Sequence, residues 1–125
     1  MIAVCLVVAG VVRATLPGPE FTLAWQHSVE KTRWEESYRL EGSRLTLVEA
    51  SVPGNGAGME PPPGSNLRDG RWAWQPRSTH AELRLTRSTH ARDYVLCAGS
   101  RCAALGDWTH ATGDDDVVTV RPCDP

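Results

Sequence analysis

Residues 21–27 read FTLAWQH, and this stretch decides the fold class because large side chains occupy every second position. A period of two places alternate residues on one face of a β-strand. Phe21, Leu23 and Trp25 therefore share one face, and that face ends in His27. The stretch is predicted to be a strand with one buried face.

The same alternation recurs downstream. One face of the next segment carries Trp34, Glu36, Tyr38 and Leu40. A glycine in the turn 41–43 suits a hairpin that continues into residues 45–50. The remaining predicted strands are residues 71–75, 81–86, 93–97, 102–105 and 117–121. About eight to ten short strands at this spacing predict a single all-β domain over residues 1–125, either an antiparallel β-sandwich or a partly closed barrel.

The amino-terminal stretch 2–12 is apolar, but it is shorter than the ~20 apolar residues that a membrane-spanning helix needs. Nothing basic precedes it, as a secretory signal would require. We expect a buried hairpin of residues 2–8 and 11–16, with a vestigial or misannotated signal as the alternative. No transmembrane segment is expected.

The amino-acid composition and net charge limit the classes of protein to which the chain can belong. The chain has 125 residues, of which 41% are hydrophobic and 22% are charged, with a formal net charge of -2. This balance is ordinary for a globular domain and excludes a generally basic nucleic-acid binder. Tryptophan is over-represented, with five tryptophans against one phenylalanine. The core is expected to use tryptophan in place of phenylalanine, at Trp25, Trp34, Trp72 and Trp74, with a place for Trp25 and Trp34 near a binding surface as the alternative.

Cys97 and Cys102 flank a turn that contains glycine. Opposed positions of a hairpin come close enough for a disulfide, so a Cys97–Cys102 bond is one expectation. Free cysteines packed as small hydrophobic residues are the other. The absence of a CxxC pair argues against a structural zinc site, and the redox compartment stays open.

Two segments fall outside the strand pattern. Residues 53–70 are too rich in glycine and proline for a ladder, and a loop of this length is either functional or disordered. Residues 106–116 end in three aspartates and are expected to form a solvated, flexible acidic segment. A repeated Arg-Ser-Thr-His-Ala unit indicates local duplication, with a metal site at His80, His90 and His110 as the alternative.

The densest polar group in the sequence is His27, Ser28 and Glu30, followed by Glu36. His27 at the end of an apolar face is typical of a structural histidine, but a His27–Glu36 pair could also serve acid–base catalysis. His27, Glu30 and Glu36 together would suit a divalent metal or a small ligand. Ser28 points away from His27 on a strand, so a serine hydrolase is not favoured.

Residues 54–60 form a glycine-rich stretch that ends in Met59 and Glu60. It lacks the order of a nucleotide-binding loop, and the three prolines that follow prevent a helix. Glycines such as Gly56 and Gly58 leave backbone amides accessible to an anion or to a carboxylate of a partner. The polyproline stretch after them suits a recognition surface.

Together, the motifs resemble a known bacterial family. The order Phe21-x-Leu-x-Trp-x-His-Ser-Val-Glu30, then Trp34-Glu-Glu36, then Gly56-Ala-Gly-Met59 before prolines is similar to the domain of unknown function 1850 family. The resemblance runs from the strand around Cys5 to about Leu105. Members are typically small proteins encoded beside TRAP transporters of the TAXI type, which import solutes with an extracytoplasmic receptor.

The resemblance implies a non-enzymatic accessory role in such uptake, through contact with the TAXI-type receptor or a TRAP membrane subunit, without a cofactor. The family-motif positions, which would form one binding surface, are His27, Ser28, Glu30, Glu36, Gly56, Gly58 and Met59. The family context favours an extracytoplasmic location, whereas a true start at Met1 would favour the cytoplasm.

Overall fold

The computed structural model describes residues 2–26, 32–54, 62–88, 92–110 and 117–125. In chain order the elements are β1 (Ala3–Val8), β2 (Val11–Thr15), β3 (Glu20–Gln26), β4 (Arg33–Glu41), β5 (Arg44–Pro53), β6 (Asn66–Arg68), β7 (Arg71–Trp74), β8 (Ser78–His80), β9 (Leu83–Thr86), β10 (Val95–Ala98), β11 (Arg101–Ala104), α1 (Leu105–Thr109) and β12 (Val117–Cys123).

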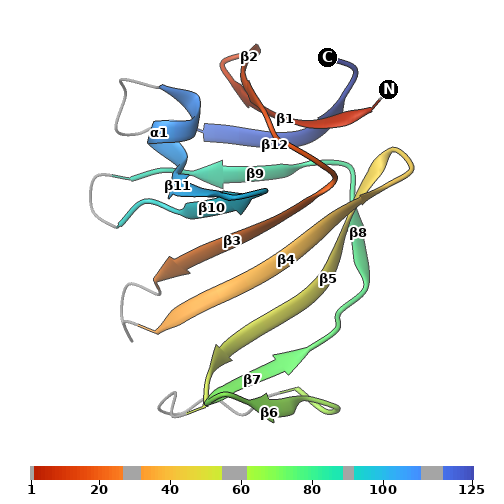
Figure 1. Cartoon of the computed structure of the whole chain (residues 1–125), viewed down its shortest axis with the longest axis vertical. Helices are drawn as coiled ribbons and strands as arrows, with labels where there is room; N and C mark the ends of the chain where they lie inside the picture. Colours follow the sequence, from red (N-terminus) through yellow and green to blue (C-terminus); the bar gives the residue numbers. More distant parts are fainter. Residues whose placement is uncertain (1, 27–31, 55–61, 89–91, 111–116) are drawn as a thin grey trace.

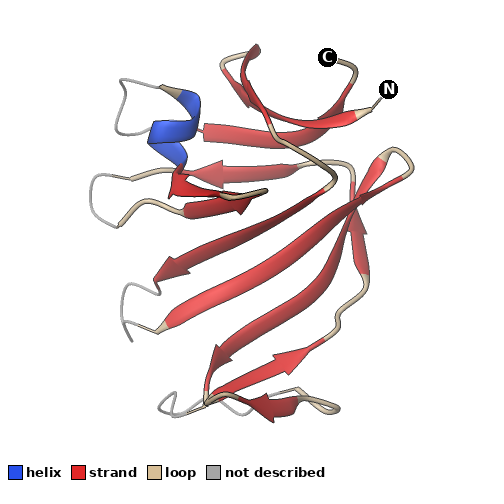
Figure 2. Ribbon diagram, in the orientation of Figure 1, coloured by secondary structure: helices blue, strands red, loops and turns tan. Residues whose placement is uncertain are grey.

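These described strands form two antiparallel sheets (Figure 1). The small sheet has four strands in the order β2-β1-β12-β9. The large sheet has the order β11-β10-β3-β4-β5-β7-β6, and β8 pairs with the opposite end of β5. Figure 2 shows that nearly all of the regular structure is strand. The predicted all-β fold is confirmed, and its described residues form a sandwich of two sheets rather than a closed barrel.

The predicted amino-terminal hairpin is confirmed as β1 and β2, but only β1 is buried, because β2 is an edge strand with Val11 and Val12 54% and 50% exposed. Ala9 and Gly10 both have positive φ, at 50° and 78°, as a two-residue turn between twisted strands requires. Strand β1 also pairs with β12, with Ala3 opposite Cys123. The first and last strands of the chain are therefore neighbours in the small sheet.

Three elements differ from the prediction. Strand β6 and the end of β5 occupy part of the segment expected to be a loop, residues 53–70. Strand β8 forms within the first copy of the repeated unit, and residues 89–91 of the second copy lie outside the described residues. Helix α1 begins directly after β11, where a strand end and a loop were expected, and is only five residues long. The aspartates 114–116 also lie outside the described residues.

The core lies between the small sheet and one end of the large sheet. It includes Leu6 and Val120 from the small sheet and Leu23 and Leu45 from the large sheet. Trp108 on α1 completes it, with 5% of the side chain exposed and its indole N–H donating to the Leu96 carbonyl at 2.9 Å. Trp108 is thus the buried tryptophan of this core, and its role was not predicted.

The expectation that four other tryptophans fill the core is mostly wrong. Trp25 is partly buried against the core cluster. Trp34, Trp72 and Trp74 are not among the residues of that cluster, and each is half-buried. The small sheet faces only part of the large sheet, so an inward-pointing side chain at the far end of the large sheet meets no opposing sheet (Figure 1).

All four cysteines form disulfides. Cys97 lies opposite Cys102 in the β10–β11 hairpin and is bonded to it, which confirms the pairing and excludes the free-thiol alternative. A second bond joins Cys5 on β1 to Cys123 on β12, across 118 positions in the sequence. This bond was not predicted, because it depends on the pairing of the first strand with the last.

Candidate binding surface

The strands next to residues 27–30 and 56–59, which carry most of the family-motif positions, have their ends at one end of the large sheet. Strand β3 ends and β4 begins with Gln26 opposite Arg33, and β5 ends with Pro53 opposite Arg71 of β7. Because Glu35 of β4 lies opposite Ser51 of β5, these strand ends occupy the same end of the large sheet (Figure 1). The predicted positions His27, Ser28, Glu30, Gly56, Gly58 and Met59 lie outside the described residues. Glu36 is the one family-motif position that the structure describes.

The inner face at this end of the large sheet is aromatic. Trp25 lies opposite Trp34 across β3 and β4, and their rings stack with centroids 6.3 Å apart and planes 16° apart. Tyr94, just before β10, packs on the other side of Trp25, with ring centroids 5.9 Å apart. Farther along the sheet, Trp72 lies opposite Val52 and Trp74 lies opposite Ala50. The face therefore continues over four strands.

Glu36 lies within this aromatic face. It is opposite Leu23 on β3 and Ala50 on β5, and it is half-buried. Its Oε1 accepts a hydrogen bond from the Tyr38 hydroxyl at 2.7 Å. The predicted pairing of Glu36 with His27 involves a residue outside the described part, so it stays a prediction. Within the described part, Tyr38 is the hydrogen-bond partner of this carboxylate.

The two tyrosines next to Glu36 have raised pKa values. Burial raises the pKa of Tyr38 well above its usual range, and the hydrogen bond to Glu36 and the charge of Glu36 raise it further. Burial also raises the pKa of Tyr94, with smaller effects from the charges of Glu36 and Asp93. Both phenols therefore stay neutral near neutral pH, and the negative charge of Glu36 acts on both rings.

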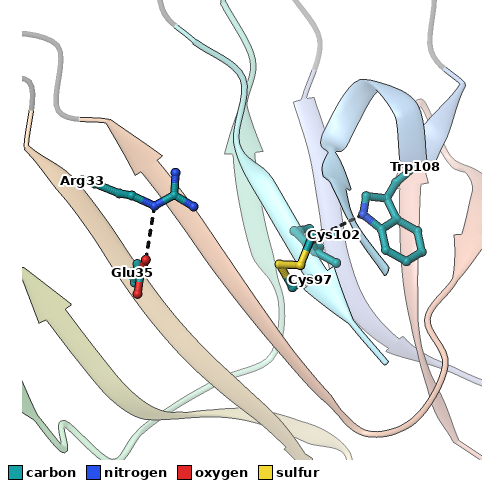
Figure 3. The surroundings of a disulfide bond; sticks show 6 residues. Arg33, Glu35, Cys97, Cys102 and Trp108 are labelled. Carbon is teal, nitrogen blue, oxygen red and sulfur yellow. Dashed lines mark hydrogen bonds and ion pairs between the residues drawn. A yellow bond between two sulfur atoms is a disulfide. The ribbon is translucent and has the colours of Figure 1, made fainter. Parts of the chain in front are cut away.

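The outer face at the same end is polar. Arg33 Nε contacts Glu35 at 3.2 Å, and Arg71 donates to the Arg33 carbonyl at 2.7 Å and to the Ser51 hydroxyl at 3.1 Å. Figure 3 shows the Arg33–Glu35 pair on β4 together with the Cys97–Cys102 disulfide, with the Trp108 indole beyond it. A hollow of about 520 Å³ lies farther along, lined among others by Arg39, Arg77 and Cys97. Glu36 does not line it.

Metal binding finds no support in the described residues. Among them there is no group of three His, Cys, Asp or Glu side chains that could hold a metal ion. Of the proposed histidine cluster, His90 lies outside the described part, while His80 lies on β8 beside Tyr38. Of the His27, Glu30 and Glu36 set, only Glu36 is described. No helix within the described ranges is long and apolar enough to cross a membrane.

The aromatic inner face was only partly predictable. Alternation placed Trp34, Glu36 and Tyr38 on one face, and the structure confirms this. Sequence analysis missed Tyr94, which joins the cluster because β10 pairs with β3, a pairing that leaves no local signal. It also assigned Trp34, Trp72 and Trp74 to the core, since alternation identifies a face but does not show whether another sheet covers it.

Comparison with known proteins agrees with the motif resemblance. A family model described as Domain of unknown function (DUF1850) matches residues 21–105. The match covers β3 to the start of α1, and so it includes the whole aromatic inner face. It begins at Phe21, later than the strand around Cys5 where the resemblance was expected to start. No curated protein and no solved structure matches the chain.

Proposed function

We propose, from the premise that this chain belongs to the Domain of unknown function (DUF1850) family, that it is a non-enzymatic accessory protein of a TAXI-type TRAP uptake system. It acts through protein–protein contact, with the solute receptor or a membrane subunit as its partner. The family resemblance implies the transport setting. The structure supports the mode of action through a surface suited to contact with another protein.

The observation that carries the proposal is the position of the tryptophans. Trp34, Trp72 and Trp74 lie on the inner face of the large sheet, yet outside the hydrophobic core. Tryptophan contributes a large share of binding energy at protein interfaces, and these three rings are half-buried rather than enclosed by the core. The strands on both sides of the family motifs end beside these rings. A partner that docks at this end would contact the rings and the motif segments together.

The chemistry around Glu36 supports binding over catalysis. Its described partner is the Tyr38 hydroxyl, whose pKa is raised well above its usual range. A phenol that holds its proton this firmly is a poor proton donor or acceptor near neutral pH, where general acid–base catalysis needs a matched pKa. The hydrogen bond orients the carboxylate. Such a group suits recognition of a positively charged partner.

The disulfides support an extracytoplasmic site of action. Both bonds engage residues within paired strands, and no cysteine is free. Disulfides persist in oxidising compartments and are rare in a reducing cytosol. The solute receptor of a TAXI-type transporter works in an extracytoplasmic compartment, where this chain would keep both bonds. The same location gives it direct access to the proposed partner.

Co-purification with defined partners tests the proposal. The tagged chain is co-expressed with the TAXI receptor and TRAP membrane subunits of its host, and the complex is isolated in mild detergent. We expect one of these subunits to co-purify with the wild type and to be lost from Trp34→Ala. Val12→Ala is the control, because Val12 is 50% exposed and lies on the small sheet. It should retain the subunit.

Thermal unfolding of both variants shows whether they fold. Recovery of no receptor or membrane subunit by the wild type would overturn the proposal. Equal recovery by folded Trp34→Ala would also contradict it, because the contact would then lie elsewhere.

A further inference from the structure

We propose that Trp25, Trp34, Glu36 and Tyr94, termed here the aromatic–carboxylate cluster, bind the guanidinium group of an arginine side chain on the partner. This inference rests on the proposed function and names the chemical group that the binding surface recognises. It follows from the geometry of the rings, the charge of Glu36 and the lack of an ion pair between Glu36 and any described arginine.

The Trp34 ring offers a face to a flat cation, and Trp25 and Tyr94 support it from the neighbouring strands. Trp25 and Trp34 stack with planes only 16° apart, and Tyr94 is tilted by 53° against Trp25. Trp34 and Glu36 are two residues apart on one strand, so their side chains leave the same face of the sheet about 6.6 Å apart. A planar group lying on the Trp34 ring can therefore reach the carboxylate with its edge.

The charge of the cluster is negative. Glu36 carries one hydrogen bond in the described part of the chain, from Tyr38 to Oε1, which leaves Oε2 for a second donor. None of the ion pairs between described residues involves Glu36. Aromatic faces are negative as well, and they attract cations most strongly when water is partly excluded. All four side chains of the cluster are half-buried, which meets that condition.

Three described arginines line hollows beside Trp25, and none of them forms an ion pair with Glu36. Arg33 points to the outer face and contacts Glu35 at 3.2 Å. Arg87, which precedes Tyr94 in the chain, contacts Asp93 at 3.1 Å. Arg92 is exposed, and it lines both hollows beside Trp25. The Glu36 carboxylate therefore has no ion pair with a described arginine, and a partner can supply one.

Guanidinium fits this surface better than ammonium does. It is planar, so it stacks on an indole, and it is weakly hydrated, so it enters a half-buried site at lower cost. Its edge donates two parallel hydrogen bonds to a carboxylate. The chain uses the same stacking internally, because the Arg101 guanidinium carbon lies 4.3 Å from the centre of the Trp108 ring.

The first test uses three small probes on the purified full chain. N-acetyl-arginine amide, its neutral isostere N-acetyl-citrulline amide and N-acetyl-lysine amide are titrated separately, and the indole N–H signals are followed by NMR. We expect saturable shifts of the Trp25 and Trp34 signals with arginine in the millimolar range, at least fivefold weaker binding of lysine, and no saturable shift with citrulline. Equal binding of citrulline or of lysine would overturn the proposal.

The second test uses two neighbouring carboxylates on opposite faces. Glu36→Gln keeps the shape of the side chain and removes its charge, and arginine affinity should fall about tenfold. Glu35→Gln is the matched control, since Glu35 lies one position away among Arg33 and Arg71 on the outer face. Its arginine affinity should stay within twofold of wild type. An equal loss in both variants would point to general charge and overturn the proposal.

The two proposals can fail separately. Arginine binding that depends on Glu36, without recovery of a transporter subunit, would refute the proposed uptake role and retain the guanidinium site. Recovery of a subunit by both the wild type and Glu36→Gln, with no arginine binding, would refute the guanidinium site and retain the uptake role.

Discussion

Cys5 on β1 is covalently bonded to Cys123 on β12, so that a single cross-link spans 118 positions of a chain of 125 residues. The two strands are also hydrogen-bonded neighbours in the small sheet. The bond therefore holds together a pairing that is the most distant in the sequence. Its contribution to stability should be correspondingly large.

Removal of this bond should cost more stability than removal of the other. The chain-entropy model assigns about 5 kcal/mol to a loop of this length and about 2 kcal/mol to the short loop between Cys97 and Cys102. Double alanine variants of each pair, compared by urea unfolding, measure the difference. Equal losses would show that the loop length does not set the stability contribution of these bonds.

The tryptophans should differ in their contribution to stability according to their distance from the core. Trp108→Ala removes a ring that is 5% exposed and breaks its hydrogen bond to Leu96, so a loss of about 3–5 kcal/mol is expected. Trp72→Ala removes a half-buried ring outside the core cluster and should cost about 1 kcal/mol. Denaturant unfolding of both variants gives the comparison. A similar loss in both would place Trp72 in the core.

Asp93 should be important for the attachment of α1. It contacts Arg87 at 3.1 Å and accepts a hydrogen bond from the Gly106 amide at 2.9 Å, and both charged side chains of the pair are largely buried. Asp93→Asn should destabilise the fold by about 2 kcal/mol. Glu20→Gln breaks the exposed pair with Arg39 and is the control, expected to cost less than about 1 kcal/mol. Thermal melts that rank the two variants in the opposite order would contradict this assignment.

Stability should fall at alkaline pH because of Tyr38. Burial raises the pKa of Tyr38 above its ordinary value of 10.0, and the Glu36 hydrogen bond and charge add to the rise. Above pH 10.0 the unfolded chain therefore loses this proton while the folded protein retains it. The contribution of Tyr38 to stability is complete below that pH and declines above it, by up to about 1.4 kcal/mol per pH unit.

Urea unfolding of the wild type and Tyr38→Phe at pH values between about 9 and 11 measures this effect, given the ordinary tyrosine pKa of about 10. The variant should show a shallower decline, because one of the two tyrosines with a raised pKa is gone. Its stability at neutral pH should be lower by about 1 kcal/mol, since Glu36 loses a hydrogen bond. Parallel declines in the two proteins would mean that Tyr38 ionises normally in the folded state.

Local sequence patterns predicted the strands but not which distant strands pair with each other. Alternation located β3, β4 and β5, and the glycine-containing turn indicated that Cys97 and Cys102 lie opposite each other. Both features could be predicted because both signals act over only a few residues. The Cys5–Cys123 bond and the contact of Tyr94 with Trp25 depend on pairings between distant strands. Helix α1 is too short for a helical period to be visible, and Gly106 within it weakens any propensity signal.

The candidate site shows the same limit. The sequence placed Glu36 on the same face as Trp34 and Tyr38, and the structure agrees. The sequence could not show that the small sheet covers only part of the large sheet. That coverage decides whether a tryptophan side chain is buried in the core or remains partly exposed. Trp34 and Trp108 look alike in the sequence, and only the opposing elements distinguish them.

The pairing of β1 with β12 also places both termini at one end of the molecule. Both termini leave from the small sheet, at the end remote from the tips of β3 and β5 (Figure 1). A surface tether or a fused protein at either terminus would therefore attach at the end of the molecule remote from the tips of β3 and β5. Immobilisation through the termini should leave those strand tips accessible, and a circular permutant that joins the termini and opens the chain elsewhere should keep the native sheet order.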